Sequence, residues 1–231
     1  MRQFLYRFVA PCLALAAVTS SALAADDVPV NSRLLVFARN SDAAGVERSL
    51  KEGANANSRN RIGETALVIA LKKDDPKQDD LKIAQLMLDA GTNVNLAAVN
   101  GITPLMAAAW SGRAEIAAQL LAKGAKLEPF DRLMKNAMIY AAGEGRTEVV
   151  RLFIGKGVDP NALYEHELTA LMWAAGGGHA ETVRALLDAG AKTDLKDDRG
   201  KTAADIAREL KFEDVVKLIE SPPAKTAAKA G

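Results

Sequence analysis

The residues of this chain that could take part in catalysis or metal binding are few and scattered. His166 lies between two carboxylates, Glu165 and Glu167, an arrangement that could supply acid–base chemistry. Adjacent carboxylates on a loop are more often simply solvated, so we expect no catalytic residue here. His179 stands apart from His166, and two isolated histidines with no cysteine beside them do not suggest a zinc site. The sequence therefore predicts no catalytic centre, no cofactor site and no metal site.

An acidic run over residues 74–80 is the other candidate for chemistry, with four carboxylates in seven residues. Carboxylates are ligands that calcium prefers, but the run lacks the alternating ligands and the central glycine of an EF-hand loop. The proline and the dense charge instead predict a solvated loop between two helices. Calcium binding is the lesser alternative.

The N-terminal segment has the layout of a secretory signal peptide. Arg2 and Arg7 precede an apolar run of about eleven residues, and Ala-Leu-Ala at 22–24 follows. A membrane-spanning helix needs roughly 20 apolar residues, so we expect cleavage and no stable membrane insertion afterwards. Cys12, the only cysteine, would leave with the leader, and its place inside the apolar run does not favour a lipoprotein. The prediction is export to the periplasm, with a leader over 1–24 and a lead-in over 25–31.

Composition and charge exclude several classes of protein. The chain has 231 residues, of which 49% are hydrophobic and 26% charged, which is enough apolar material for a substantial core. Only 5% are aromatic, a balance that suits helix packing better than a β-sandwich. The net charge is +1, and loss of the leader would change it to −1, so no global field attracts nucleic acid. We expect a mostly helical protein that does not bind nucleic acid.

A repeat of about 33 residues organises the chain. A glycine followed by two similar residues recurs at spacings of 38, 33, 33 and 33, and the first spacing contains the acidic insertion. A helix commonly ends on a residue in the left-handed conformation, which glycine adopts at little cost. These glycines therefore predict helix ends at Gly53, Gly91, Gly124, Gly157 and Gly190.

A second set of positions starts short helices in step with these glycines. Each carries a side-chain oxygen that can accept a hydrogen bond from the first helical turn. The set comprises Ser32, Thr65, Thr103, Asn136, Thr169 and Thr202. A second apolar stretch follows each of the central starts with the spacing of one helix face, as at Ile116, Leu120 and Leu121. Each unit is thus predicted to be helix, turn, helix and loop, with Leu121 in the core.

The segment GITPLMAAAWSGRAEIAAQLLAKGAKLE resembles an ankyrin repeat, and five further copies cover most of the chain. The resemblance implies an all-α solenoid of about six helix-turn-helix repeats, with projecting loop or β-hairpin fingers and a concave binding face. It also implies a structural role for His179, which falls in the turn between two helices. The expected repeats are 32–62, 63–100, 101–133, 134–166, 167–199 and 200–220, followed by a flexible tail over 221–231.

The fingers of such a solenoid are where a partner protein would bind. Five are expected, over 58–62, 96–100, 129–133, 162–166 and 195–199. Aromatic and arginine side chains dominate the hot spots of protein interfaces. On that ground we predict contacts at Phe130, Arg132, Tyr164, His166, Trp110, Arg59 and Arg61. The alternative for Phe130, Tyr164 and Trp110 is packing against their neighbours. Tyr140 and Trp173 share a repeat position with Ala107, and for them the concave face and the core both stay open.

Two central fingers depart from the repeat pattern. Met134 and Glu167 stand where Gly63, Gly101 and Gly200 occupy the other fingers. A non-glycine residue held at positive φ there would be strained unless the loop changes shape. The two interpretations are a changed turn of no consequence and a pair of fingers reshaped to meet a partner.

The chain is similar to small exported ankyrin-repeat proteins of Gram-negative bacteria, and this resemblance implies protein–protein recognition in the periplasm. The partner is expected to be another protein, whose identity the sequence does not contain, and the chain itself is expected to be monomeric. Two roles stay open, an accessory or scaffold factor and an inhibitor or immunity protein that neutralises a toxic enzyme. An enzymatic role is the remote third alternative.

Overall fold

The computed structural model describes residues 28–73 and 78–221, which form an all-helical stack of repeats. The predicted leader over 1–24, almost all of the predicted tail, and Asp74 and Asp75 of the acidic run lie outside the described residues. None of the helices in the described part has the length and apolar character that a membrane crossing requires. The described residues contain twelve α-helices and no strand, so the fingers are turns rather than β-hairpins.

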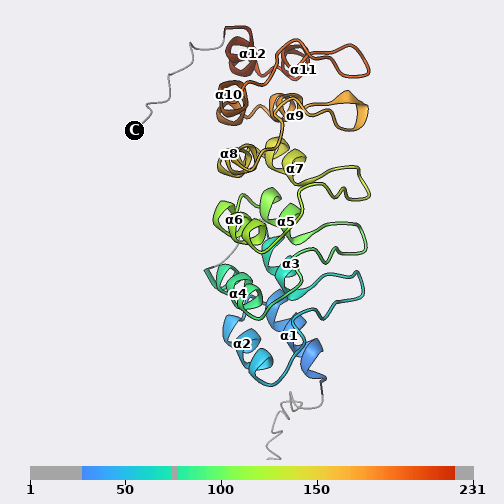
Figure 1. Ribbon diagram of the computed structural model, residues 1–231, viewed down its shortest axis with the longest axis vertical. Coiled ribbons are helices and arrows are strands. Elements are labelled where there is room, and N and C mark those ends of the chain that lie inside the picture. The colour runs from blue at the N-terminus through green and yellow to red at the C-terminus, as the bar shows by residue number, and fades with distance from the viewer. Residues whose placement is uncertain (1–27, 74–77, 222–231) are drawn as a thin grey trace, which may run out of the picture.

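The helices alternate between two layers, with the fingers projecting beside the inner layer (Figure 1). The inner helices are α1 (Val30–Arg39), α3 (Ala66–Leu71), α5 (Pro104–Trp110), α7 (Ala137–Gly143), α9 (Ala170–Gly176) and α11 (Ala203–Glu209). The outer helices are α2 (Ala43–Lys51), α4 (Gln78–Asp89), α6 (Ala114–Ala122), α8 (Thr147–Gly155), α10 (Ala180–Asp188) and α12 (Glu213–Glu220). A short 3₁₀ turn, η2 (Glu165–Glu167), lies in the fourth finger.

Five of the six predicted helix starts are confirmed by their hydrogen bonds. The Thr103 and Thr169 side chains each accept a bond of 3.2 Å from a first-turn amide, and Thr65, Asn136 and Thr202 do the same at their helices. The prediction for Ser32 was wrong. Helix α1 begins two residues earlier, because the carbonyl of Pro29 accepts the amides of Ser32 and Arg33, so the lead-in is shorter than expected.

The predicted helix ends are confirmed. Gly53, Gly91, Gly124, Gly157 and Gly190 all have φ between 74° and 92°. Glycine alone adopts this region without a steric cost from a β-carbon, so each outer helix from α2 to α10 stops at a fixed point. The chain then turns into the next finger with the same geometry, which keeps the repeats in register.

One continuous core runs through the whole stack. Its largest fully buried side chains include Phe153, Leu67, Leu120, Leu171 and Leu186. The expected place of Leu121 in this core was wrong by one residue. Leu120 is fully buried whereas Leu121 is partly exposed, because the buried face of α6 is centred on Ile116, Ala117 and Leu120.

The acidic insertion was predicted to be a solvated loop, but part of it is helical. Residues 78–80 form the first turn of α4. Asp80 is buried and accepts a bond of 2.5 Å from Lys73 Nζ, which also reaches the carbonyl of Ala38 at 3.2 Å and the hydroxyl of Ser41 at 2.6 Å. A buried carboxylate is tolerated only when it is paired, and this pair ties α4 to the end of α1.

Candidate protein-binding surface

Three large aromatic side chains lie along the inner helices on the side of the fingers. Trp110 ends α5, Tyr140 lies in α7 and Trp173 in α9, and all three are partly exposed. Tyr140 and Trp173 occupy one repeat position in successive helices, so the regular stacking of the repeats places them side by side. We call Trp110, Tyr140 and Trp173 the aromatic row.

The aromatic row borders two hollows between the inner helices and the fingers. The first, of about 260 Å³, is lined by Trp110 and Tyr140 together with Lys72 and Asn100. The second, of about 320 Å³, is lined by Trp173 and by residues of the fourth to sixth repeats: Gly143, Leu168, Met172, Gly176, Gly177, Arg199 and Ile206. Each hollow therefore combines an apolar floor with one cationic side chain. We call this surface the inner face.

A lysine lies between two members of the aromatic row. Lys135 Nζ is 4.6 Å from the centroid of the Trp173 ring and 5.7 Å from that of Tyr140, within the range of cation–π attraction. The Tyr140 hydroxyl donates a bond of 2.5 Å to Asp131. Burial and the negative charge of Asp131 raise the pKa of Tyr140, so the phenol stays protonated and remains a donor. These contacts fix the orientation of the rings.

The charges of the inner face are layered, with carboxylates below and cations above. Glu64 is buried beneath Lys72, at 2.7 Å from its Nζ, and Asp197 is buried beneath Arg199, also at 2.7 Å. Burial alone would raise the pKa of Glu64, but the hydrogen bonds from Lys72 and Asn60 outweigh it and lower the pKa. At these two places an approaching partner therefore meets the cation rather than the carboxylate.

The predicted contact residues of the central fingers do not form one set. Phe130 and Arg132 are exposed, as expected for contact residues. Tyr164 is half-buried, packs against the core, and has its pKa raised by that burial. His166 is exposed, and its Nδ1 lies 2.7 Å from an oxygen of Asp198 on the fifth finger. Tyr164 thus matches the packing alternative more closely than the binding one.

The first finger contributes one free and one engaged arginine. Arg61 is exposed at its tip. Arg59 instead donates to the carbonyl of Gly63 at 2.8 Å and to that of Ala97 in the second finger at 2.7 Å. Arg59 therefore links two fingers, and its substitution would disturb structure as well as any contact with a partner.

The remaining predicted features are placed plainly by the structure. His179 Nε2 donates to the carbonyl of Gly143 at 2.8 Å, and a β-carbon at Gly145 or Gly177 would lie within 2.6 Å of its ring, so its role is structural. The group of Glu165, His166 and Glu167 is exposed on η2, where carboxylates are ordinarily solvated rather than tuned for catalysis.

Sequence reasoning left the role of Tyr140 and Trp173 open and missed Lys135, Lys72 and Arg199. One signal in the sequence could have pointed to this surface. Tyr140 and Trp173 occupy, in successive repeats, the position that Ala107 fills with a small side chain. A core position would not need such large side chains in two successive repeats.

Comparison with known proteins agrees with this architecture. The family described as ankyrin repeats in three copies matches residues 34–131 and 137–229. The crystal structure of the ankyrin repeat protein EF0377 superposes with a TM-score of 0.70 and 29% identity, covering 83% of this chain and 98% of that one. This chain belongs to the ankyrin repeat family. Ankyrin repeats generally mediate protein–protein interaction, and the fold is typically a non-enzymatic module.

Two curated relatives match about half of this chain. The inactive serine/threonine-protein kinase TEX14 of Mus musculus is 27% identical over 115 residues, which is 50% of this chain and 8% of that protein. TEX14 of Bos taurus is 30% identical over 112 residues, which is 48% of this chain and 7% of that protein. The chain spans less than a tenth of the length of these relatives.

Proposed function

We propose that this protein is a periplasmic interaction module that binds another protein on its inner face, as an accessory or scaffold factor. The observation that carries the proposal is the aromatic row. Three aromatic side chains from successive inner helices remain partly exposed beside two hollows, although burial would be the favourable state for such large apolar groups. Tryptophan, tyrosine and arginine, which all occur on the inner face, are the residues most enriched in interface hot spots.

The layered charges indicate which chemistry of partner the inner face would favour. Lys72, Lys135 and Arg199 lie at the surface, whereas Glu64 and Asp197 are buried beneath their cations. A partner segment with exposed carboxylates beside an aromatic or aliphatic residue would meet both the cations and the hollows. Charge complementarity of this kind sets specificity and the association rate more than affinity.

Export is part of the proposal and rests on the N-terminal sequence pattern, with Arg2 and Arg7 ahead of a short apolar run and a small-residue site at 22–24. The mature protein should be released by osmotic shock and begin near Ala25. Sequencing of the N-terminus of the released protein tests this, and retention of Met1 on protein from the cytosol would contradict it.

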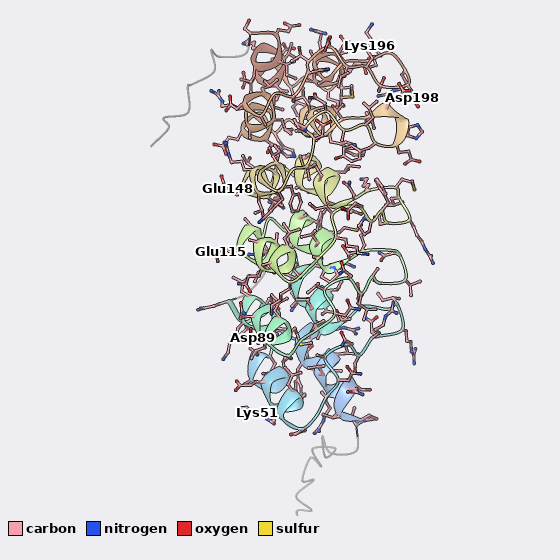
Figure 2. All side chains as sticks on the ribbon, viewed as in Figure 1. Lys51, Asp89, Glu115, Glu148, Lys196 and Asp198 are labelled. Atoms are coloured by element: carbon pink, nitrogen blue, oxygen red, sulfur yellow. The ribbon has the colours of Figure 1, made fainter. Side chains whose placement is uncertain are left out.

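Crosslinking and pull-down from a periplasmic extract test the binding role. The bait is the purified protein, compared with Trp173→Ala and Lys135→Met, and with Glu148→Ala on the outer layer as a matched control. Figure 2 shows Glu148 and Glu115 along the outer helices, on the opposite side from Asp198 of the fifth finger. A hot-spot loss of about 2 kcal/mol would weaken capture roughly 30-fold in the Trp173 variant.

The control decides how the result is interpreted. Helical circular dichroism must stay unchanged in all three variants. Capture that is equally reduced by Glu148→Ala, or unaffected by Trp173→Ala and Lys135→Met, would contradict binding on the inner face. If the captured protein is an enzyme whose activity disappears in the complex, the inhibitor role replaces the accessory role.

A further inference from the structure

Three of the four pairs of successive fingers are joined at their tips by one backbone hydrogen bond. We call the boundary between two fingers a seam and number the seams from the N-terminus. The tip bonds run from Val99 N–H to the Ile62 carbonyl (2.9 Å), from Arg132 N–H to Asn100 (3.0 Å), and from Asp198 N–H to His166 (3.1 Å). They belong to the first, second and fourth seams.

The same three seams are closed at the base by an asparagine side chain. Asn95 accepts the amide of Lys126 and donates to the carbonyl of Gly124, both at 2.9 Å. Asn161 repeats the pattern with the amide of Lys192 at 2.7 Å and the carbonyl of Gly190 at 3.2 Å. Asn57 accepts the amide of Asn93 at 2.7 Å.

The third seam, between the third and fourth fingers, has neither connection. Glu128 stands in the place of the asparagine, and within the described residues the Asp159 amide has no acceptor. At the tip, the amide of Glu165 and the carbonyl of Leu133 are likewise without a hydrogen-bond partner in the described chain. Backbone groups that the other seams satisfy internally are thus available here.

The turn of the fourth finger has a different shape. In three other fingers an oxygen of Asn60, Asp131 or Asp197 accepts two amides at the turn. Tyr164 occupies that position in the fourth finger, and Ala98 in the second, and neither offers such an acceptor. The turn of the fourth finger is the 3₁₀ element η2, in which His166 and Glu167 take φ of 60° and 57°. The strain expected at Glu167 is therefore present, and Met134 shares it at 54°.

A hollow of about 390 Å³ lies at the open seam. Its apolar wall is formed by Leu127, Phe130, Met138, Val158 and Tyr164. Phe130 is 44% exposed, and the neighbouring Leu133 and Leu163 are 67% and 57% exposed. At this seam Glu128 makes no bond across the base, and each finger contributes one aromatic side chain. The result is an apolar cavity in place of the hydrogen bonds that join the other seams.

Exposed charges are divided unevenly between the two fingers and their bases. Over residues 156–167 the carboxylates of Asp159, Glu165 and Glu167 accompany one cation, Lys156, which gives a net charge of −2. Over residues 123–134 Glu128 accompanies three cations, Lys123, Lys126 and Arg132. A segment carrying lysine or arginine beside an apolar residue complements the carboxylates of the fourth finger and the hollow.

We infer that the third seam is a second docking surface, which takes an extended basic segment of a partner protein. An apolar side chain of that segment fills the hollow, and its flanking cations face the carboxylates of the fourth finger. Its backbone supplies the acceptor for the Glu165 amide and the donor for the Leu133 carbonyl, as in strand addition to an unpaired edge. This surface shares no residue with the aromatic row and goes beyond the function proposed for it.

Isothermal titration calorimetry with a synthetic peptide tests the inference. The probe is a short peptide, blocked at both ends, with one leucine between two pairs of lysines. Two control peptides carry glutamate in place of lysine, or glycine in place of leucine. The full protein should bind the probe at least about tenfold more tightly than either control, and binding should weaken with salt because the rim charges become screened. Equal affinities for the three peptides would overturn the inference.

A variant that closes the seam provides the sharper test. Glu128→Asn restores the amide that joins the other seams and should weaken peptide binding by about tenfold or more without loss of thermal stability. Glu128→Gln removes the same charge with a side chain of glutamate's length, so it should weaken peptide binding less than Glu128→Asn does. Equal binding by the Asn variant and the original, or equal losses in both variants, would contradict the inference. Glu148→Ala, on the outer layer, should leave peptide binding unchanged.

Discussion

The second and third seams lie side by side, yet one is joined and the other is open. Their inner helices pack alike, since α5 contacts α7 to the same extent as α7 contacts α9. Among the differences between the fingers, Asn95 at the base becomes Glu128 and Asp131 in the turn becomes Tyr164. The comparison teaches that the helical layers carry the continuity of the fold, while the fingers are free to vary.

The largest effect is expected in the helical layers. Leu120→Ala should lower the free energy of unfolding by about 2–5 kcal/mol, because it leaves a cavity in a core shared by adjacent repeats. Leu121→Ala should cost less, since its side chain is partly exposed. Urea unfolding of both variants measures the difference, and equal losses would show that the helical layers do not dominate stability.

Removal of the amide that joins the second seam should have a smaller effect. Asn95→Ala leaves the Lys126 amide and the Gly124 carbonyl without their partner, at a cost of about 0.5–1.5 kcal/mol. Glu128→Ala is the matched change at the third seam and should cost little, because Glu128 makes no such bond. Thermal melting compares the two. An equal loss of stability in Glu128→Ala would contradict the inference that only the second of these two seams is joined by a side chain.

A change that gives the third seam the asparagine of the second should stabilise the protein modestly. Glu128→Asn supplies the missing acceptor for the Asp159 amide and should raise the free energy of unfolding by up to about 1 kcal/mol. Urea unfolding measures this gain independently of any ligand. A loss of stability would indicate that the fourth finger cannot move close enough to the third to form the bond.

Acid should weaken the first finger through Glu64. The pKa of this carboxyl is lowered from the ordinary value of 4.5, so its contribution to stability is present above that value and disappears as pH falls through the lowered pKa. Glu64→Gln should therefore narrow the difference in stability between pH 7 and pH 3. Urea midpoints at the two pH values measure it, and an unchanged difference would contradict the assigned ion pair with Lys72.

The fold was largely predictable because its signals are local and periodic. Thr103 and Thr169 cap their helices, and Gly124 and Gly157 end theirs, through short-range stereochemistry that the residue type specifies. Ser32 was assigned wrongly because periodicity placed a cap there, while Pro29 offers an earlier carbonyl. Positive φ at Met134 and Glu167 was one of the two outcomes that the same stereochemistry predicted, the other being a loop of changed shape.

The binding surfaces were harder to predict because they depend on contacts between repeats. The residues adjacent to Tyr140 and Trp173 in the sequence do not indicate whether each ring faces the core or the fingers. Lys135, which contacts both rings, lies outside both of their helices. The sequence shows Glu128 at a repeat position where Asn57, Asn95 and Asn161 stand in other repeats. The consequence of this replacement could be inferred only once the structure showed which backbone amide each asparagine binds.

The aromatic row also gives the molecule an optical property. The chain has two tryptophans, Trp110 and Trp173, and both lie in this row. The ultraviolet emission of the folded protein therefore originates on the inner face, and exclusion of water there by a partner should move it to shorter wavelength. A ligand at the third seam should leave the emission wavelength unchanged. One unlabelled sample can thus show which of the two surfaces a given partner occupies.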